Sequence, residues 1–135
     1  MDRTLTTFLH ATMPFAGFIG IEGMAASREE VRTRVDFDEK LCTSGGVLHG
    51  GLLMTLADTS GAWCALLNLP AAGWQTTTIE SKTNFLRPVR GGHVEAISRP
   101  LHVGRTIMVV DTEVHDADGR LAARVTQTQA FLAPR

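Results

Sequence analysis

The chain has 135 residues, of which 44% are hydrophobic and 20% are charged, and its formal net charge is -1. This composition suits one folded domain and excludes a disordered chain. The near-zero charge, without any basic run, argues against a nucleic-acid or membrane surface.

Two cysteines, Cys42 and Cys64, provide neither a disulfide framework nor a C-x-x-C pair. The first residues contain no apolar signal segment, and the longest weakly charged stretch is too polar to span a bilayer. We therefore expect a single domain over residues 1–135 that works in the cytoplasm, where thiols stay reduced.

The N-terminal third predicts a short helix followed by a hairpin. Apolar residues recur at helical spacing over residues 4–11, and we expect Pro14 and Gly17 to end that helix. Residues 26–29 supply the turn of the hairpin. Residues 31–37 then alternate apolar and polar side chains, which is the period of a strand with one wet face.

Residues 50–68 predict the central helix. Apolar side chains cover most of its surface, and a helix that is apolar on nearly all sides is buried. Three or four antiparallel strands follow, with a hairpin turn at residues 116–119. Their expected ranges are 75–87, 93–102, 105–114 and 121–131. These elements pack most economically as an α+β fold, in which one curved antiparallel sheet wraps around one long central helix.

Asp58 is the only Asp, Glu, Lys or Arg between Lys40 and Glu80. A carboxylate in an apolar segment is costly to bury unless it has a partner or a function. Gly50 and Gly51 precede it at the expected helix N-terminus, where uncovered N–H groups attract negative charge. A carboxylate that acts as nucleophile or general base, and amides that stabilise an oxyanion, are the parts of a hydrolytic site.

The same residues can also have purely structural roles, and the motif alone does not decide between a catalytic and a structural interpretation. The two glycines allow a tight turn or close helix packing. His49 can cap the helix, and Asp58 can pair with a distant Arg or Lys.

The spacing of Gly50 and Asp58 constrains how they could act together. Eight residues of helix separate them by about 12 Å along the axis. An attacking group must come within about 3–3.5 Å of the carbonyl carbon, so one helix cannot easily supply both groups. Two antiparallel helices from two subunits can, and a joint role therefore predicts a twofold dimer with shared sites.

Several short motifs occur in a fixed order along the chain. They are Gly46-Val47-Leu48-His49-Gly50-Gly51, Leu56-Ala57-Asp58, Thr83-Asn84-Phe85-Leu86-Arg87-Pro88 with Gly91-Gly92, Val103-Gly104-Arg105, and Asp118-Gly119-Arg120-Leu121-Ala122. Over nearly the whole chain they resemble the hotdog-fold acyl-CoA thioesterases. The subgroup they resemble most contains the phenylacetic-acid-degradation thioesterases and 4-hydroxybenzoyl-CoA thioesterase.

The histidines His49, His93, His102 and His115 show no metal-ligand spacing such as H-E-x-x-H, so we expect hydrolysis by water without a metal or other cofactor. The resemblance implies roles for individual residues. The Gly50 amide would polarise the thioester carbonyl, and Asp58 of the opposite subunit would attack it or activate water. His49 would shape the oxyanion loop, and Thr78 would hold the water or the substrate. Coenzyme A would lie along the subunit boundary of a homodimer, which the resemblance places in a dimer of dimers. Candidate substrate contacts are Gly51, Arg87, Arg90, Arg105, Leu53 and Trp63.

Thr43 departs from the family pattern. The family often has Asn or Gln six residues before the histidine, where this chain has Thr43, and a hydroxyl reaches less far than an amide. This difference keeps a second hypothesis open, namely a non-catalytic acyl-CoA or acyl-carrier binding module of the same fold. A dehydratase of this fold ranks below both, and the sequence does not name the acyl group.

Overall fold

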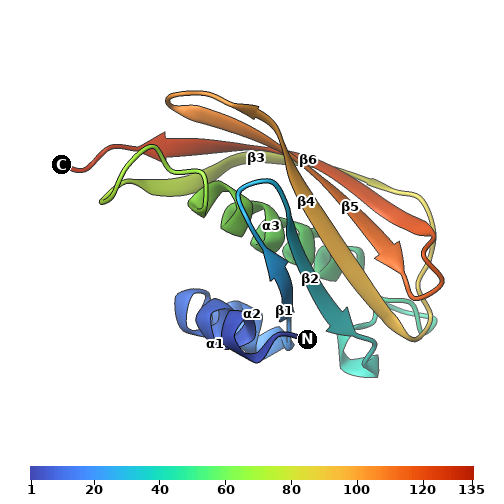
Figure 1. Ribbon diagram of the computed structural model, residues 1–135. Coiled ribbons are helices and arrows are strands. Elements are labelled where there is room, and N and C mark those ends of the chain that lie inside the picture. Colours follow the sequence, from blue (N-terminus) through green and yellow to red (C-terminus); the bar gives the residue numbers. More distant parts are fainter.

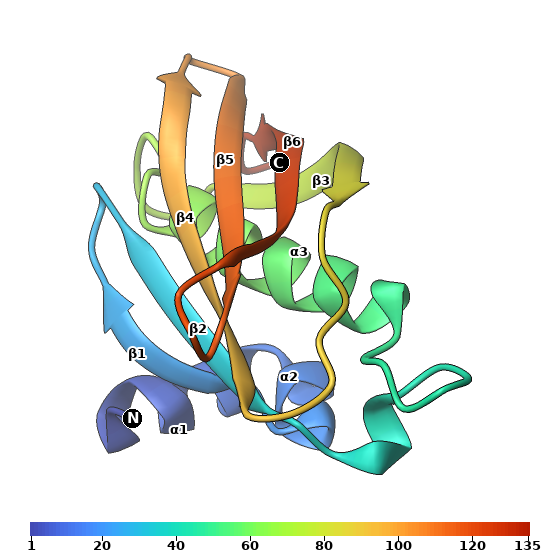
Figure 2. The same ribbon diagram turned by 90° about the vertical axis from the view of Figure 1, so that its right-hand side faces the viewer.

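Six antiparallel strands form one sheet in the order β1-β2-β4-β5-β6-β3, and the computed structural model describes residues 1–135 (Figure 1). The strands are β1 (Glu22–Ala26), β2 (Val31–Asp36), β3 (Gln75–Phe85), β4 (His93–Val103), β5 (Ile107–Asp116) and β6 (Leu121–Leu132). The helices are α1 (Arg3–Thr12), α2 (Pro14–Ile19) and α3 (Gly50–Leu66), with a 3-10 turn at Glu39–Leu41. The sheet curves around α3, so the expected α+β hotdog arrangement is confirmed (Figure 2).

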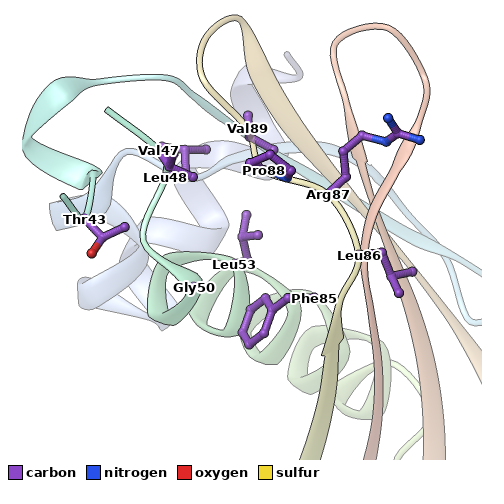
Figure 3. A pocket seen from close by; sticks show the side chains of 10 residues that line it. All are labelled: Thr43, Val47, Leu48, Gly50, Leu53, Phe85, Leu86, Arg87, Pro88 and Val89. Atoms are coloured by element: carbon purple, nitrogen blue, oxygen red, sulfur yellow. The ribbon is translucent and has the colours of Figure 1, made fainter. Parts of the chain in front are cut away.

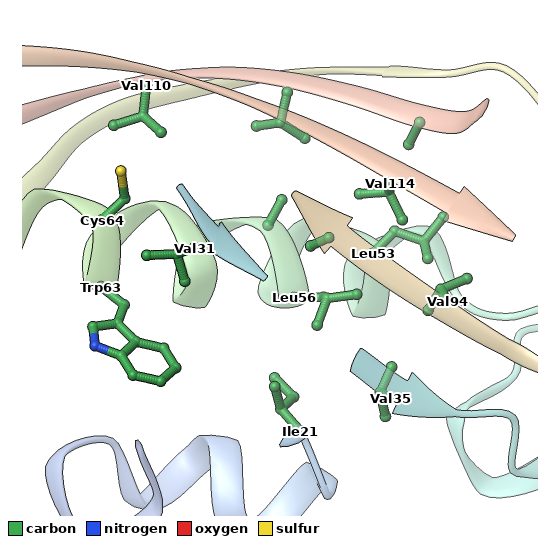
Figure 4. Packing of buried hydrophobic residues seen from close by; sticks show 14 of the residues in the cluster. Ile21, Val31, Val35, Leu53, Leu56, Trp63, Cys64, Val94, Val110 and Val114 are labelled. Atoms are coloured by element: carbon green, nitrogen blue, oxygen red, sulfur yellow. The ribbon is translucent and has the colours of Figure 1, made fainter. Parts of the chain in front are cut away.

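The sheet covers one side of the central helix α3, and α1 packs against Trp63 on another side. Leu56 and Cys64 are fully buried in a hydrophobic cluster of 23 residues. Trp63 points away from the sheet, towards the N-terminal helices (Figure 4). Its ring packs against Phe8 of α1 with the ring centroids 5.8 Å apart. Burial of each large apolar side chain of this kind contributes about 1.5–3 kcal/mol to folding. None of the helices has the length and apolar character needed to cross a membrane.

The chain starts with two short helices instead of the single helix that we expected. Pro14 opens α2 because the first position of a helix needs no backbone N–H and suits the fixed φ of proline. Gly17 lies inside α2, where a Cβ atom would come within 3.3 Å of the His10 ring. Gly20 ends the helix with φ at 86°, a conformation that favours glycine. The prediction that Pro14 and Gly17 end one helix was therefore wrong.

Strand β3 is an edge strand that pairs only with β6. Thr78 lies opposite Gln129 and Glu80 lies opposite Thr128, so Ile79 has no partner and forms a β-bulge. A bulge bends the strand and redirects its side chains. This bulge lies next to Thr78, at the middle of α3.

Candidate active site

The N-terminus of α3 leaves one backbone donor free. His49 is the N-cap residue, and its Nδ1 accepts a hydrogen bond from the N–H of Gly51 at 2.8 Å. Because Nδ1 accepts, a neutral His49 ring carries its hydrogen on Nε2. The N–H of Gly50 has no partner in the chain. The expectation of two open amides therefore holds for Gly50 and was wrong for Gly51.

Gly50 borders a hollow of about 410 Å³ between α3 and the segment that follows β3 (Figure 3). The lining is mostly apolar: Leu53 points from α3 towards Pro88 and Val89, and the Phe85 ring lies beside the helix. A Cβ at position 50 would lie 3.1 Å from that ring, so glycine lets the ring approach the helix. Thr43 lines the same hollow, and the Arg87 guanidinium points away from Gly50.

Asp58 lies two turns further along α3 and accepts two hydrogen bonds on one oxygen. The Thr78 hydroxyl donates to Oδ1 at 2.8 Å, and Gln127 Nε2 donates to the same atom at 2.9 Å. Oδ2 makes no hydrogen bond within the chain, and no Arg, Lys or His pairs with the carboxylate. The structure therefore excludes, within one chain, the ion pair that would have explained Asp58 as a structural residue.

Two glutamines of β6 support this carboxylate from behind. Gln127 and Gln129 are both completely buried. Gln129 Nε2 donates to the Thr78 hydroxyl at 2.7 Å, and its Oε1 accepts from Thr76 at 3.0 Å. The hydroxyl of Thr78 thus has its proton committed to Asp58 and one of its two acceptor positions filled by Gln129.

Asp58 faces a hollow of its own, of about 310 Å³. Its lining is polar apart from Met54, and it consists of Gly51, Met54, Thr55, Asp58, Thr78 and Ser81. Gly50 and Asp58 therefore open onto different hollows of one uninterrupted helix. The separation of about 12 Å expected from helical rise is preserved.

The remaining predicted substrate contacts do not gather in one place. Arg90 lies in the β3–β4 connection and donates to the Gly45 carbonyl at 3.0 Å. Arg105 lies in the turn at the opposite end of β4, and the 11 residues of that strand span about 35 Å. Trp63 is 1% exposed and borders neither hollow. Among these candidates only Leu53 and Arg87 adjoin the hollow of Gly50.

Cys64 is a core residue of α3. Burial raises the pKa of its thiol to about 11, so the thiol stays protonated at neutral pH. Cys64 is therefore a small buried hydrophobic residue of the core.

Gln127 and Gln129 were not predicted as site residues. Alternate residues of β6 point at α3, and the inward series is Ala123, Val125, Gln127, Gln129 and Phe131. Two carboxamides on an otherwise apolar face were the available signal, because buried polar groups require hydrogen-bond partners.

An antiparallel sheet wrapped around one buried helix is the hotdog arrangement, and in this chain that helix carries a carboxylate and a free amide. Residues 45–123 match the family model described as "Thioesterase superfamily". The chain belongs to the thioesterase superfamily.

Individual relatives agree with this assignment. A protein of Saccharolobus solfataricus that carries the name esterase is 33% identical over 112 residues, which cover 82% of this chain and 73% of that protein. The solved structure of a mutant of the thioesterase PA1618 from Pseudomonas aeruginosa has a TM-score of 0.88 at 27% identity, covering 94% of this chain and 93% of that one. The thioesterase HI1161 from Haemophilus influenzae gives a TM-score of 0.89 at 27% identity, covering 98% and 93%.

Proposed function

We propose that this protein hydrolyses acyl-CoA thioesters, with Asp58 as the reacting carboxylate and the Gly50 amide as the oxyanion donor. Membership of the superfamily makes thioester hydrolysis the reaction class. The observation that carries the residue assignment is the environment of Asp58. Its Oδ1 is held by neutral donors, its Oδ2 is unbonded, and it lines a hollow. A carboxylate without a cation partner remains available as a base or nucleophile.

Both routes open to Asp58 give the free acid and coenzyme A. As a general base, Asp58 takes a proton from water while the water oxygen bonds to the carbonyl carbon. As a nucleophile, Asp58 bonds to that carbon and forms an anhydride, which water then hydrolyses. In either case the carbonyl oxygen becomes an oxyanion that accepts from the Gly50 N–H, and the carbonyl re-forms as the C–S bond breaks and the thiolate leaves. In the general-base route the thiolate receives the proton that Asp58 took from water, and in the nucleophilic route it receives a proton of the water that hydrolyses the anhydride.

The two groups act together only across two subunits in this proposal. Twofold-related, antiparallel copies of α3 would bring Gly50 of one chain towards Asp58 of the other. The exposed edge strand β3 supports this arrangement, because Ile79 and Phe85 are 58% and 53% exposed. Met54, on the same face of α3 as Asp58, is 39% exposed. The outer edge of β3 has no strand partner in the chain, so its backbone N–H and C=O groups form a surface on which a second chain can pair. The pairing of two such dimers rests on the family resemblance.

Coenzyme A would follow the subunit boundary, where its phosphates could meet Arg87 and Arg90 of one chain and Arg105 of another. Guanidinium groups suit phosphate oxygens. The apolar hollow beside Gly50 would take the acyl group, with Leu53 as a lining residue. Aryl thioesters are the first candidates because of the resemblance to the phenylacetic-acid-degradation and 4-hydroxybenzoyl-CoA thioesterases. Both cysteines are free, which suits a reducing cytoplasmic setting.

A second candidate function is a non-catalytic acyl-CoA or acyl-carrier binding module. Thr43 favours it, because this residue lines the hollow of Gly50 with a short hydroxyl in place of the family's longer amide. In such a module Asp58 would orient the bound thioester without attacking it.

The test is steady-state hydrolysis of a panel of aryl-, short-chain and medium-chain acyl-CoA thioesters by the wild type and by Asp58→Asn. The asparagine keeps an oxygen that can accept from Thr78 and Gln127, so the fold should survive. Loss of the carboxylate should lower kcat by roughly 100-fold or more. Asp118→Asn is the matched control, because Asp118 is an exposed turn residue. Equal, measurable rates in wild type and Asp58→Asn would overturn the role of Asp58. Binding of the thioesters without turnover by the wild type would favour the binding module.

A further inference from the structure

We propose that Gln127 and Gln129 are positioning residues that hold Asp58 by Oδ1 and leave Oδ2 as the reacting oxygen. The inference rests on the proposed hydrolase function and assigns different roles to the two oxygens of one carboxylate. Oδ1 receives two hydrogen bonds from the sheet, whereas Oδ2 receives none. Asp58 lines its hollow, so Oδ2 is the oxygen that remains for water or the acyl carbon.

Gln127 fixes the carboxylate from the strand side. Its side chain is completely buried, and Nε2 lies 2.9 Å from Asp58 Oδ1. A flipped carboxamide would place its oxygen against the carboxylate oxygen, where neither atom can donate. The presence of the carboxylate therefore determines the orientation of the amide, and the amide in turn restricts rotation of the carboxylate.

Gln129 acts on Asp58 through Thr78. Each hydrogen bond in the series from Thr76 to Asp58 has a defined donor and acceptor. Thr76 donates to Gln129 Oε1 at 3.0 Å, Gln129 Nε2 donates to Thr78 Oγ1 at 2.7 Å, and Thr78 donates to Asp58 Oδ1 at 2.8 Å. A hydroxyl that accepts from Gln129 has its own proton left for Asp58. The series ends on the carboxylate, which is the only member that cannot donate when ionised.

Gly61 gives the Gln127 carboxamide its space. A Cβ at position 61 would lie 1.8 Å from Gln127 Oε1, so glycine on α3 lets the carboxamide occupy this position beside Asp58. Oε1 is buried and has no hydrogen-bond partner. An unsatisfied buried oxygen destabilises the fold, and it persists here with the donor end of the same amide directed at Asp58. The Gln127 carboxamide therefore serves to position Asp58 and does not serve to stabilise the fold.

The first experiment compares Gln127→Met with Thr112→Val in steady-state hydrolysis of the best thioester of the panel. Methionine has a similar length and no donor. We expect kcat to fall roughly 10- to 100-fold, with KM within about threefold, because misplacement of a reacting group mainly affects the chemical step. Thr112→Val is the matched control. Thr112 is buried on the neighbouring strand β5 and bonds Ser98 at 2.7 Å, without contact to Asp58, so its kcat should stay at the wild-type value.

Gly61→Ala tests the same contact from the helix side. The added methyl group should push the carboxamide of Gln127 off Asp58 and lower both kcat and Tm. In the double variant with Gln127→Ala the space is restored, so Tm should recover relative to Gly61→Ala while kcat stays low. A merely structural role for Gln127 would instead restore kcat together with Tm.

Gln127→Glu supplies a readout that loss of folding cannot imitate. Two adjacent carboxyl groups share one proton, and in that state the introduced carboxyl group could still donate to Asp58. Once the pH rises far enough to remove the shared proton, two carboxylates face each other. We therefore expect a new alkaline limb in the kcat profile that the wild type lacks. If Asp58→Asn loses turnover but Gln127→Met and Gly61→Ala keep the wild-type kcat, this inference is overturned and the proposed function stands. Absence of any turnover by the wild type would overturn the proposed function and this inference with it.

Discussion

Replacement of Gly50 by proline removes the proposed oxyanion donor while keeping the helix. Gly50 is the first residue of α3, and its N–H has no partner in the chain, so the backbone loses no hydrogen bond. Proline is favoured at this position of a helix. His49 already has φ at -60° and ψ at 133°, the extended conformation that a residue before proline adopts. The Phe85 ring, which would lie 3.1 Å from an added Cβ, is half exposed and can move aside.

The expected cost of Gly50→Pro follows from the single free amide at this helix end. His49 occupies the Gly51 N–H, so no neighbouring backbone donor replaces the one that is lost. Removal of one oxyanion donor costs about 2.7–4 kcal/mol, which lowers kcat roughly 100- to 1,000-fold. Gly50→Ala brings the same contact with Phe85 but keeps the N–H, and it should retain most of the activity. Equal kcat values for the proline and alanine variants would refute the oxyanion role of Gly50.

The same variant tests whether the site is shared between subunits. Gly50→Pro and Asp58→Asn should each be nearly inactive alone. In a randomly mixed population about half of the dimers contain one chain of each kind, and one of their two sites then has both native groups. Denaturing and refolding an equal mixture should therefore restore about a quarter of the wild-type activity. No recovery, with dimers present in light scattering, would show that each chain builds its own site.

Two further predictions concern the thiols and the β5–β6 turn. Because the pKa of Cys64 is about 11, only about one thousandth of this thiol is ionised at pH 8, and a thiol reagent should label the partly exposed Cys42 alone in the native protein. Labelling of Cys64 at the rate of Cys42 would contradict its burial. In the turn, backbone N–H groups and the Arg120 guanidinium hold the pKa of Asp116 below its ordinary value of 3.8. Because the pKa of this carboxyl is lower in the folded chain than in the unfolded chain, its ionised form stabilises the fold at any pH above the unfolded-state pKa. This stabilisation is lost as the pH falls through the folded-state pKa. Urea unfolding should therefore show Asp116→Ala less stable than wild type at pH 7, with the gap narrowing below about pH 4; a gap independent of pH would contradict the charge contribution.

Local patterns predicted most of the fold. The central helix was expected over residues 50–68 and ends at Leu66, because an apolar segment of that length without strand alternation has few other solutions. The hairpin turn at Gly119 was equally readable, since its φ of 78° favours glycine. The second N-terminal helix was missed because its six residues are too few to show a helical period.

The candidate site was only partly predictable. Asp58 and Gly50 stood out because each breaks the pattern of its own segment. The glutamines could not be connected to Asp58, because Gln127 is 69 residues away in sequence. Their contact depends on which strands pair and in which register, and a shift by one residue would turn both glutamines outward. Arg90 and Arg105 show the opposite: they are close in sequence, but β4 places them at its two ends. Their positions in the sequence motifs gave no information about this separation.

The bulge at Ile79 changes which residues of β3 face the central helix. Before it, even-numbered residues such as Thr76 and Thr78 point inward. Beyond it, odd-numbered residues take over, because Ser81 lines the hollow of Asp58 and Phe85 covers Gly50. In an unbroken strand the period of two would place Thr78 and Phe85 on opposite faces. One extra residue therefore lets a single strand serve both ends of the site, and deleting Ile79 would force the strand to give up either its carboxylate partner or its aromatic cover.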